Sequence, residues 1–369
     1  MRLFGLVDRW LLGRFLRAYL TFTGAALLAF VVVDLFANLD SLSEAGLLVA
    51  AGRRYGSMVP EVWFTLGPFL ALVAALWAIL QLQRQNELVP LIAAGLSPLR
   101  LAWPLLLAGI VLAPLAWADR ELLLPALAPL RREARRSTTG PGWQTPRPIV
   151  VVIPGESGER GIGVLAPRFF APESSELRDV RFTRLDAGRS SELETILAAR
   201  GRPAEGGWLL ENGLRITCTR GPDGLTRDAV AAIPSQGWLL RSSIRPDDVE
   251  AAIDSPAFQS RKQIRDQLRR TPGMRHLEVR LHERWTYSLA GVALLLVSVP
   301  ITLRGQGGWD SYLRFITCVL LGLAFFLAST ISYELGSKGA LPPLIAAWAP
   351  LVGFGLIGLS LLARDARRA

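Results

Sequence analysis

The sequence predicts an α-helical membrane protein with six transmembrane helices, three on each side of an inserted β-rich, jelly-roll-like domain. Six apolar stretches support this fold class, because each is close to the roughly 20 residues that a helix needs to cross the hydrocarbon core. Residues 120–284 form a long, largely polar block between the third stretch and the fourth. The 369 residues are 51% hydrophobic, and their mean hydropathy of +0.33 suits a membrane protein with a soluble insert.

The six apolar stretches define the order of the predicted elements. They lie at 18–37, 59–80, 99–118, 285–303, 313–333 and 341–363. We therefore divide the chain into three parts. These are residues 1–119 with the first three helices, 120–275 with the β-rich domain and its flanking helices, and 276–369 with the last three helices and a short tail.

Positive charge in the short loops predicts the orientation of these helices. Arginine gathers on the side of cytoplasmic loops and is sparse on the opposite side of a membrane. One side of the predicted membrane carries Arg2, Arg9, Arg14, Arg17, Arg84, Arg100, Arg304, Arg314, Arg364, Arg367 and Arg368. The short loops of the other side carry Arg53, Arg54 and Lys338. We therefore expect both termini in the cytoplasm and the block 120–284 outside it.

Residues 1–17 precede the first span and have an amphipathic pattern. Leu6, Trp10 and Phe15 recur at near-helical spacing with arginines between them. Such a segment can lie as a separate helix in the cytoplasmic interface, or it can be the start of the first span. The sequence leaves both interpretations open.

The insert changes to the periodicity of β-strands. Short apolar or alternating runs predict strands, and the Asn212-Gly213 pair predicts a hairpin turn between two of them. The predicted strands are 149–153, 177–185, 208–210, 214–217, 230–233 and 238–240. Many short strands with Gly and Pro between them are typical of a sandwich or jelly roll. Residues 246–270 predict one helix, and a second helix from about 275 continues into the fourth span.

The connection between the second and third spans, about residues 84–96, predicts a short helix of its own. Leu88, Leu91 and Ile92 fall at positions i, i+3 and i+4, which gives one apolar face. Gly95 suits the residue that ends a helix, and Ser97-Pro98 suits the start of the next. A partner protein could bind this face, but an ordinary interfacial connector has the same pattern.

Composition and motifs exclude several classes of function. The net charge of +10 is not gathered in a basic stripe with aromatic residues, which disfavours nucleic-acid binding. No phosphate-binding loop is present, and the pair His282-Glu283 lacks the second histidine of a zinc protease helix. We expect no catalytic residue, no cofactor and no metal. Any energy from ATP must come from a partner.

Several motifs, in the same order along the chain, resemble the LptF/LptG family of permeases. The clearest is an E-L-x-x-x-x-A-x-G-[hydrophobic]-S pattern that begins at Glu87. The other similar segments are 6–10, 33–35, 281–284 with Pro300, and 341–350. The last of these is closer to the LptG type. Pro90, inside the connecting helix, and the absence of a basic residue near the outer end of the first span depart from the family pattern.

The resemblance implies a permease subunit of an ABC-type complex in the Gram-negative inner membrane. Two such subunits pair, dock on a cytoplasmic ATPase dimer, extract lipopolysaccharide and pass it through their periplasmic jelly rolls to LptC/LptA-like bridge proteins. By this resemblance the contact with the ATPase involves Arg84, Asn86, Glu87, Leu88, Leu91, Ile92, Gly95, Leu96 and Ser97. The candidate residues of the lipid cavity, on the first and fifth spans, are Phe30, Asp34, Phe326 and Tyr333.

Two other functions stay open beside this one. A secondary transporter would need several charges near the middle of its spans, and these spans have few. A non-transporting assembly or sensor protein, whose β domain binds a protein partner, is the main alternative. Asp34 either faces the helix bundle, where a carboxylate is functional by default, or is solvated at the level of the headgroups.

Overall fold

The structure is a computed structural model that describes residues 5–44, 47–139, 143–146, 148–154, 160–172, 174–185, 192–220, 226–234, 237–242, 244–253, 258–270, 275–304 and 308–367. The chain divides into two compact units. The helical unit comprises Met1–Leu39, Tyr55–Ala126 and Gly273–Ala369, and the second unit comprises Asp40–Arg54 and Leu127–Pro272.

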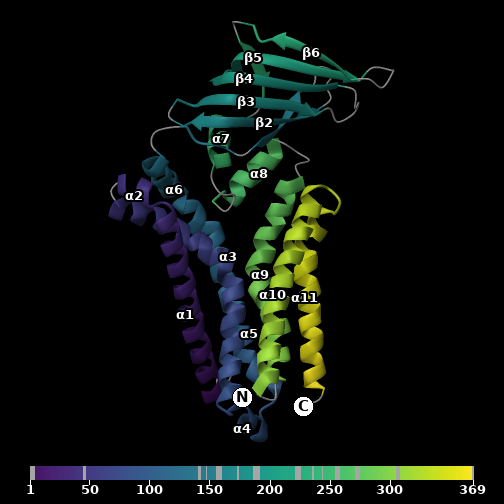
Figure 1. Cartoon of the computed structure of the whole chain (residues 1–369). Helices are drawn as coiled ribbons and strands as arrows, with labels where there is room; N and C mark the ends of the chain where they lie inside the picture. The colour runs from purple at the N-terminus through teal and green to yellow at the C-terminus, as the bar shows by residue number, and fades with distance from the viewer. Residues whose placement is uncertain are drawn as a thin grey trace. The chain divides into compact units, whose positions relative to one another are not determined.

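The six membrane helices expected from the sequence are confirmed. Among the described residues, six helices are long and apolar enough to cross a membrane. The helices of this part of the chain are α1 (Leu6–Ala37), α3 (Leu47–Arg84), α4 (Leu88–Ala93), α5 (Pro98–Ala118), α9 (Arg275–Leu303), α10 (Gly308–Ser337) and α11 (Pro343–Ala366), shown in Figure 1. The short α4 connects α3 to α5.

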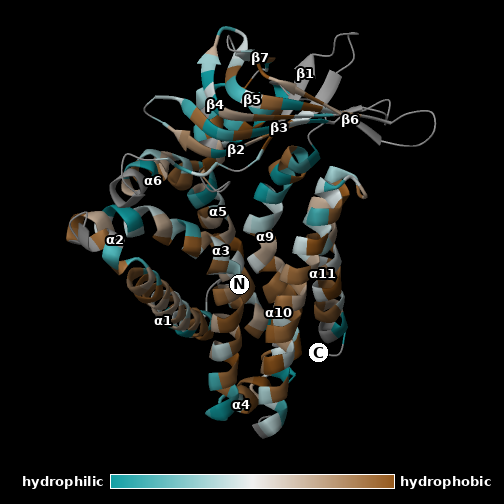
Figure 2. Cartoon of the chain, turned by 45° about the horizontal axis from the view of Figure 1, so that its top comes forward, coloured by the Kyte–Doolittle hydropathy of each residue, from teal (hydrophilic) through white to brown (hydrophobic). Residues whose placement is uncertain are grey.

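The membrane helices differ in how much of their surface the unit covers. In the most apolar window of α9, 67% of the residues are buried, whereas only 6% are buried in α1 and 17% in α10. Buried side chains form two apolar clusters in this unit. The first is built mainly from α1, α3, α5 and α9, and the second from α3, α9 and α10. Long apolar stretches of α10 and α11 are visible in Figure 2. Exposed apolar side chains on a membrane helix indicate that this helix faces lipid or another membrane protein.

Residues 6–17 are the first turns of α1 and not a separate interfacial helix. Leu11 and Phe15 are almost completely buried in the core that α1 shares with α3 and α5. Asp8, Leu11 and Phe15 lie on one face of α1, as positions i, i+3 and i+7 do in any helix. Of the amphipathic pattern, Phe15 thus belongs to the packed face of α1, whereas Leu6 is exposed.

The predicted third span, 99–118, coincides with α5 (Pro98–Ala118). A π-helical turn, η1 (Asp119–Leu123), joins α5 to α6 (Leu124–Thr139) without a break. The apolar run ends at the charges of η1, but helical structure continues through them. One of these charges, Glu121, pairs with Arg284 of α9. The second predicted span is longer at its start, since α3 begins at Leu47.

The insert is β-rich, as expected. Within its described residues, seven strands form one antiparallel sheet in which β1 to β6 follow in chain order and β7 pairs with β5. The strands are β1 (Ile149–Pro154), β2 (Arg160–Ala171), β3 (Glu176–Leu185), β4 (Glu192–Ala204), β5 (Gly207–Arg220), β6 (Thr226–Ala232) and β7 (Trp238–Arg241), shown in Figure 1. β2 and β4 had not been predicted. Short helices complete this part of the chain: α2 (Leu39–Glu44), α7 (Pro246–Ile253) and α8 (Arg261–Arg270).

One face of the sheet carries the core of the second unit. Phe182 and Ile196, directly opposite each other on β3 and β4, pack there with Trp208 of β5. Val249 of α7 is buried in the same cluster. The Trp208 indole donates a hydrogen bond to the Ile244 carbonyl at 3.1 Å, which ties the chain just before α7 to the sheet. The helix thus covers part of the apolar face.

The predicted hairpin at Asn212-Gly213 is wrong. Both residues lie inside β5, and the turn between β4 and β5 is at Glu205-Gly206. Asn212 does take a positive φ of 52°, the conformation for which Asn is favoured, but the strand continues through it. A side chain at Gly213 would meet the Leu197 carbonyl, so a glycine is required by the close approach of β4.

The single helix predicted for 246–270 is two helices. α7 ends at Ile253, and α8 begins after Ser260, whose hydroxyl accepts from the Gln263 amide while the Gln263 side chain accepts from the Ser260 amide. This reciprocal capping box specifies a new helix start. It is visible in the sequence as Ser260-x-x-Gln263, but it had not been recognised there.

Candidate functional site

The first candidate site is the segment between α3 and α5. One backbone turn separates its short helix α4 from α3, and a second turn separates α4 from α5. α3 ends in a Schellman motif with Asn86 at a positive φ of 54°. In this motif the Asn86 and Glu87 amides donate to the Gln83 and Leu82 carbonyls at 3.2 and 3.0 Å. The chain is therefore free to change direction and start α4 at Leu88.

A second Schellman motif ends α4. Gly95, with a φ of 83°, and Leu96 donate their amides to the carbonyls of Ile92 and Leu91 at 2.9 and 3.2 Å. Ser97 then caps α5, since its hydroxyl accepts from the Arg100 amide at 3.3 Å, and Pro98 is the first residue of that helix. The helix, the stop and the new helix predicted from the sequence are confirmed.

Pro90 neither delays α4 nor kinks it. It is the third residue of the helix, and the amides of the first turn have no partner within a helix in any case. A proline there loses no hydrogen bond. This departure from the family pattern is therefore compatible with an ordinary short helix.

The apolar face predicted for α4 is divided between the core and the surface. Leu88 is buried in the core of the helical unit, and Leu91 packs against that core. Val89 and Ile92 are exposed, by 69% and 44%. Leu88 and Leu91 therefore anchor α4, whereas Val89, which the spacing argument had not included, belongs to the surface open to a partner. Arg84, Asn86 and Gly95 are also exposed, and Glu87, Leu96 and Ser97 are half-buried.

Arg14 of α1 holds the beginning of this segment. Its guanidinium lies 3.0 Å from the Glu87 carboxylate and donates to the Gln85 side chain at 2.7 Å. It also lies over the Trp10 ring, 4.0 Å from the ring centre. The Arg14 side chain is 13% exposed and that of Glu87 is 38% exposed. Sequence reasoning missed Arg14, because it is 73 residues away from Glu87 along the chain.

A groove of about 880 Å³ runs between the first turns of α1 and the segment. One wall belongs to α1 and the other to the turn after α3 and to α4. The lining residues are Leu6, Val7, Arg9, Trp10, Asn86, Glu87, Pro90 and Leu91. Among them Leu6 is almost fully exposed. The surface around Glu87 is therefore larger than α4 alone.

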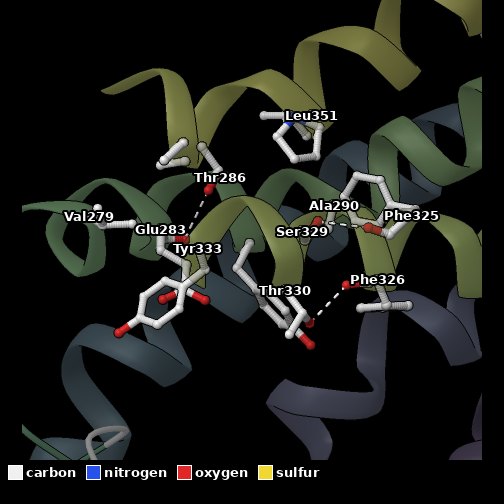
Figure 3. Close-up of a pocket in the computed structure, with 14 residues that line it drawn as sticks. Val279, Glu283, Thr286, Ala290, Phe325, Phe326, Ser329, Thr330, Tyr333 and Leu351 are labelled. Carbon is white, nitrogen blue, oxygen red and sulfur yellow. Dashed lines mark hydrogen bonds between the residues drawn. The ribbon is translucent and has the colours of Figure 1, made fainter. Parts of the chain in front are cut away.

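The second candidate site is a pocket of about 230 Å³ between α9, α10 and α11 (Figure 3). Hydroxyl groups, one carboxylate and aromatic rings surround it. The hydroxyls belong to Thr286, Tyr287, Ser329, Thr330 and Tyr333, and the carboxylate belongs to Glu283. Phe325, Phe326 and Leu351 supply apolar walls. Within the described residues, no group of three or more His, Cys, Asp or Glu side chains could hold a metal ion.

Arginines surround the carboxylate end of this pocket. Arg280 donates to the Tyr333 hydroxyl at 3.2 Å. Arg284 pairs with both oxygens of Glu121, at 3.1 and 3.2 Å, and its side chain is only 1% exposed. Arg120 also interacts with Glu283. Buried charges in a membrane helix bundle are costly and mark functional or bracing positions.

Two of the four predicted cavity residues, Phe326 and Tyr333, line this pocket. Phe30 and Asp34 lie on α1 and are not among its lining residues. Asp34 is half-buried and accepts a hydrogen bond from the Asn38 amide group at 3.3 Å. Sequence reasoning missed Glu283 and Tyr287 as pocket residues. Their position beside Arg284, in the segment similar to the family's H-x-R motif, could have indicated them.

A comparison with protein-family models decides the identity of the family. The model described as "Lipopolysaccharide export system permease LptF/LptG" matches residues 9–364. The chain belongs to the LptF/LptG family. It is therefore a lipopolysaccharide export permease subunit of an ABC-type system and a multi-pass protein of the inner membrane. The match covers both candidate sites but does not separate the LptF type from the LptG type. No curated protein matches the chain.

Proposed function

We propose that this subunit moves lipopolysaccharide, or a related lipid, with energy from a separate cytoplasmic ATPase dimer that docks on α4. The observation that carries the proposal is how α4 is anchored on one side and exposed on the other. Two Schellman motifs isolate it, Leu88 anchors it in the core, and Val89 and Ile92 are left exposed. A helix that is fixed at its base and apolar at its tip suits a partner's groove.

The arrangement of the helix ends supports the cytoplasmic side for this surface. In Figure 1 the start of α1, the helix α4 and the end of α11 lie at the same end of the helical unit. Arg304, just after α9, donates to the Leu361 carbonyl of α11 at 3.4 Å, and Gln83 of α3 donates to the Thr302 carbonyl of α9 at 2.7 Å. Arg304, one of the arginines expected inside, thus lies beside the end of α11, whereas Arg2 and Arg368 lie outside the described residues. We propose that both termini are cytoplasmic and the β unit periplasmic.

The pocket between α9, α10 and α11 is our proposed contact for a phosphorylated sugar headgroup. Hydroxyls suit the sugar, and the guanidinium of Arg280, bonded to Tyr333, suits a phosphate. The uncovered apolar faces of α1 and α10 suit acyl chains or a second LptF/LptG-type subunit. We further propose that the β unit passes the lipid toward LptC/LptA-like bridge proteins.

The alternative is a non-transporting assembly or sensor protein. Its support is that α7 fills part of the apolar face of the sheet, through Val249 and Ile253, as in a binding module with a closed core. In that case the β unit binds a protein partner and carries no lipid.

A pull-down separates the two functions. The tagged chain is extracted from its native membranes in detergent, and mass spectrometry identifies the proteins and lipids that co-elute. We expect an ABC ATPase, a second six-span chain and lipopolysaccharide. Recovery of neither an ATPase nor a glycolipid would instead support the assembly or sensor function.

A further inference from the structure

The first turns of α1 hold the α4 segment at both of its ends. Before α4, Arg14 binds Gln85 and Glu87, as described above. After α4, Asp8 binds Arg100, with 2.8 Å between its carboxylate and the guanidinium. The same carboxylate oxygen accepts the Gly5 amide at 2.8 Å. Both contacts join residues more than 70 positions apart, so neither follows from helix formation alone.

Each contact joins one largely buried side chain to a partner, Arg100 or Glu87, that is 38% exposed. The Asp8 side chain is 4% exposed, and that of Arg14 is 13% exposed. In the same turns of α1, Leu11 and Phe15 pack in the core that also contains Leu88. The first turns of α1, the end of α3, α4 and the start of α5 are thus joined by two ion pairs and one shared core.

The rest of α1 is packed less tightly against the helical unit. Its buried residues are Asp8, Leu11, Phe15, Tyr19 and Thr23. Beyond Thr23, the described part of α1 has no buried residue up to its end at Ala37. A helix that is fixed at one end and uncovered at the other moves at its far end when its base is displaced.

We propose that Asp8 and Arg14 are positioning residues that make α4 and the base of α1 move as one body. A displacement of α4 by the docked ATPase then passes directly to the first membrane span. This inference rests on the proposed docking of the ATPase at α4 and goes beyond it, since it assigns the transmission step to residues outside the docking surface.

The test uses the purified complex of the full chain with its ATPase partner, reconstituted in liposomes that contain lipopolysaccharide. The variants are Arg14→Met and Arg100→Met, with Arg14→Lys as the conservative change. Arg17→Met is the matched control, because Arg17 is exposed and its hydrogen bond goes to the Gly13 carbonyl of its own helix. Three quantities are measured: ATPase retained on the chain, ATP hydrolysis, and lipid released per ATP.

A label on the outer half of α1 gives a direct readout of movement. Gly24 is exposed, and a side chain added there would meet no atom within 4 Å. A spin label on Gly24→Cys, in a Cys218→Ser background, reports the change that a non-hydrolysable ATP analogue causes. We expect this change to be lost in Arg14→Met and Arg100→Met and to persist in Arg17→Met.

The expected result is retained ATPase with at least about a fivefold loss of lipid released per ATP, the lower end of common coupling energies. Arg14→Lys should recover part of the loss. Unchanged lipid release per ATP in both Met variants would overturn the proposal. Loss of the ATPase from Arg14→Met would also overturn it, because Arg14 would then belong to the docking surface. Failure of the proposed function is distinct: the wild-type chain would then retain no ATPase.

Discussion

The helical unit contains two arginine–glutamate pairs that differ mainly in their access to water. In the pair of Arg284 and Glu121, the side chains are 1% and 11% exposed. In the pair of Arg14 and Glu87, they are 13% and 38% exposed. The first pair is closed between α9 and η1, and the second opens onto a groove. The same two residue types therefore form a closed brace in one place and, in the other, a water-accessible link between α1 and the α4 segment.

Elementary electrostatics explains why exposure decides between these roles. Removing one partner of a buried pair leaves a charge without water or a counterion, which costs several kcal/mol. At a half-exposed pair, water compensates much of the loss. The half-exposed pair therefore links α1 to the α4 segment with a smaller cost of desolvation than the closed pair.

The largest expected effect tests the claim that the closed pair of Arg284 and Glu121 contributes more to stability than the half-exposed pair. The test is the substitution Arg284→Met. We expect it to lower the free energy of unfolding by about 3–5 kcal/mol, because Glu121 then stays buried without its partner. Thermal unfolding in detergent measures the effect. Arg314→Met is the matched control, since Arg314 pairs with Asp310 on the surface of α10. The double variant Arg284→Met with Glu121→Leu should recover much of the loss, and a double variant as unstable as the single one would contradict the explanation.

The next effect concerns binding rather than stability. Glu87→Arg should weaken retention of the ATPase by about 1–2 kcal/mol, roughly tenfold, while membrane insertion stays intact. The change reverses the charge at the groove and places a second guanidinium beside Arg14. Copurification of the ATPase measures it, and Glu334→Arg, the same change on an exposed residue of α10, is the control. Undiminished copurification would remove Glu87 from the docking surface.

These two pairs also indicate what the sequence could and could not predict. Local patterns were sufficient for α4: Gly95, Ser97 and Pro98 specify the end of one helix and the start of the next through backbone geometry. The pairing of Glu87 with Arg14 spans 73 residues, and a single sequence holds no distance between them. The family resemblance identified the segment and its motif but not the arginine that holds it.

Long-range contacts also decide the structure where local patterns are silent or misleading. The apolar run ends at residue 118, but helical structure continues through the charges of η1, where the distant Arg284 pairs with Glu121. The Asn212-Gly213 pair does have the backbone geometry of a turn at Asn212, but the neighbouring strands extend β5 through it. In both places a tertiary contact overrides the local preference, as is common for strands and for buried charges.

A smaller effect is expected on lipopolysaccharide binding at the pocket between α9, α10 and α11. Tyr333→Phe removes the hydroxyl that accepts from Arg280 and leaves the ring in place. We expect lipopolysaccharide binding to weaken by about 1 kcal/mol, close to fivefold, the usual contribution of one hydrogen bond. Binding is measured with the purified chain in detergent. Tyr312→Phe makes the same change near the other end of α10, outside the pocket, and should have no effect. Equal effects of the two variants would argue against the pocket.

The smallest effect is expected at an ion pair that is more exposed than the two compared above. Lys338 and Glu334 lie 3.9 Å apart, four residues from each other, and their side chains are 75% and 55% exposed. Lys338→Met should change the free energy of unfolding by less than about 0.5 kcal/mol, because water and salt screen such a pair. If thermal unfolding instead gave a loss near that of Arg284→Met, exposure would not be the variable that decides how much such a pair stabilises the chain. A graded result, large at Arg284, intermediate at Arg14 and negligible at Lys338, would show that the contribution of each pair follows its exposure, and that the α1–α4 link holds while it stays open to water.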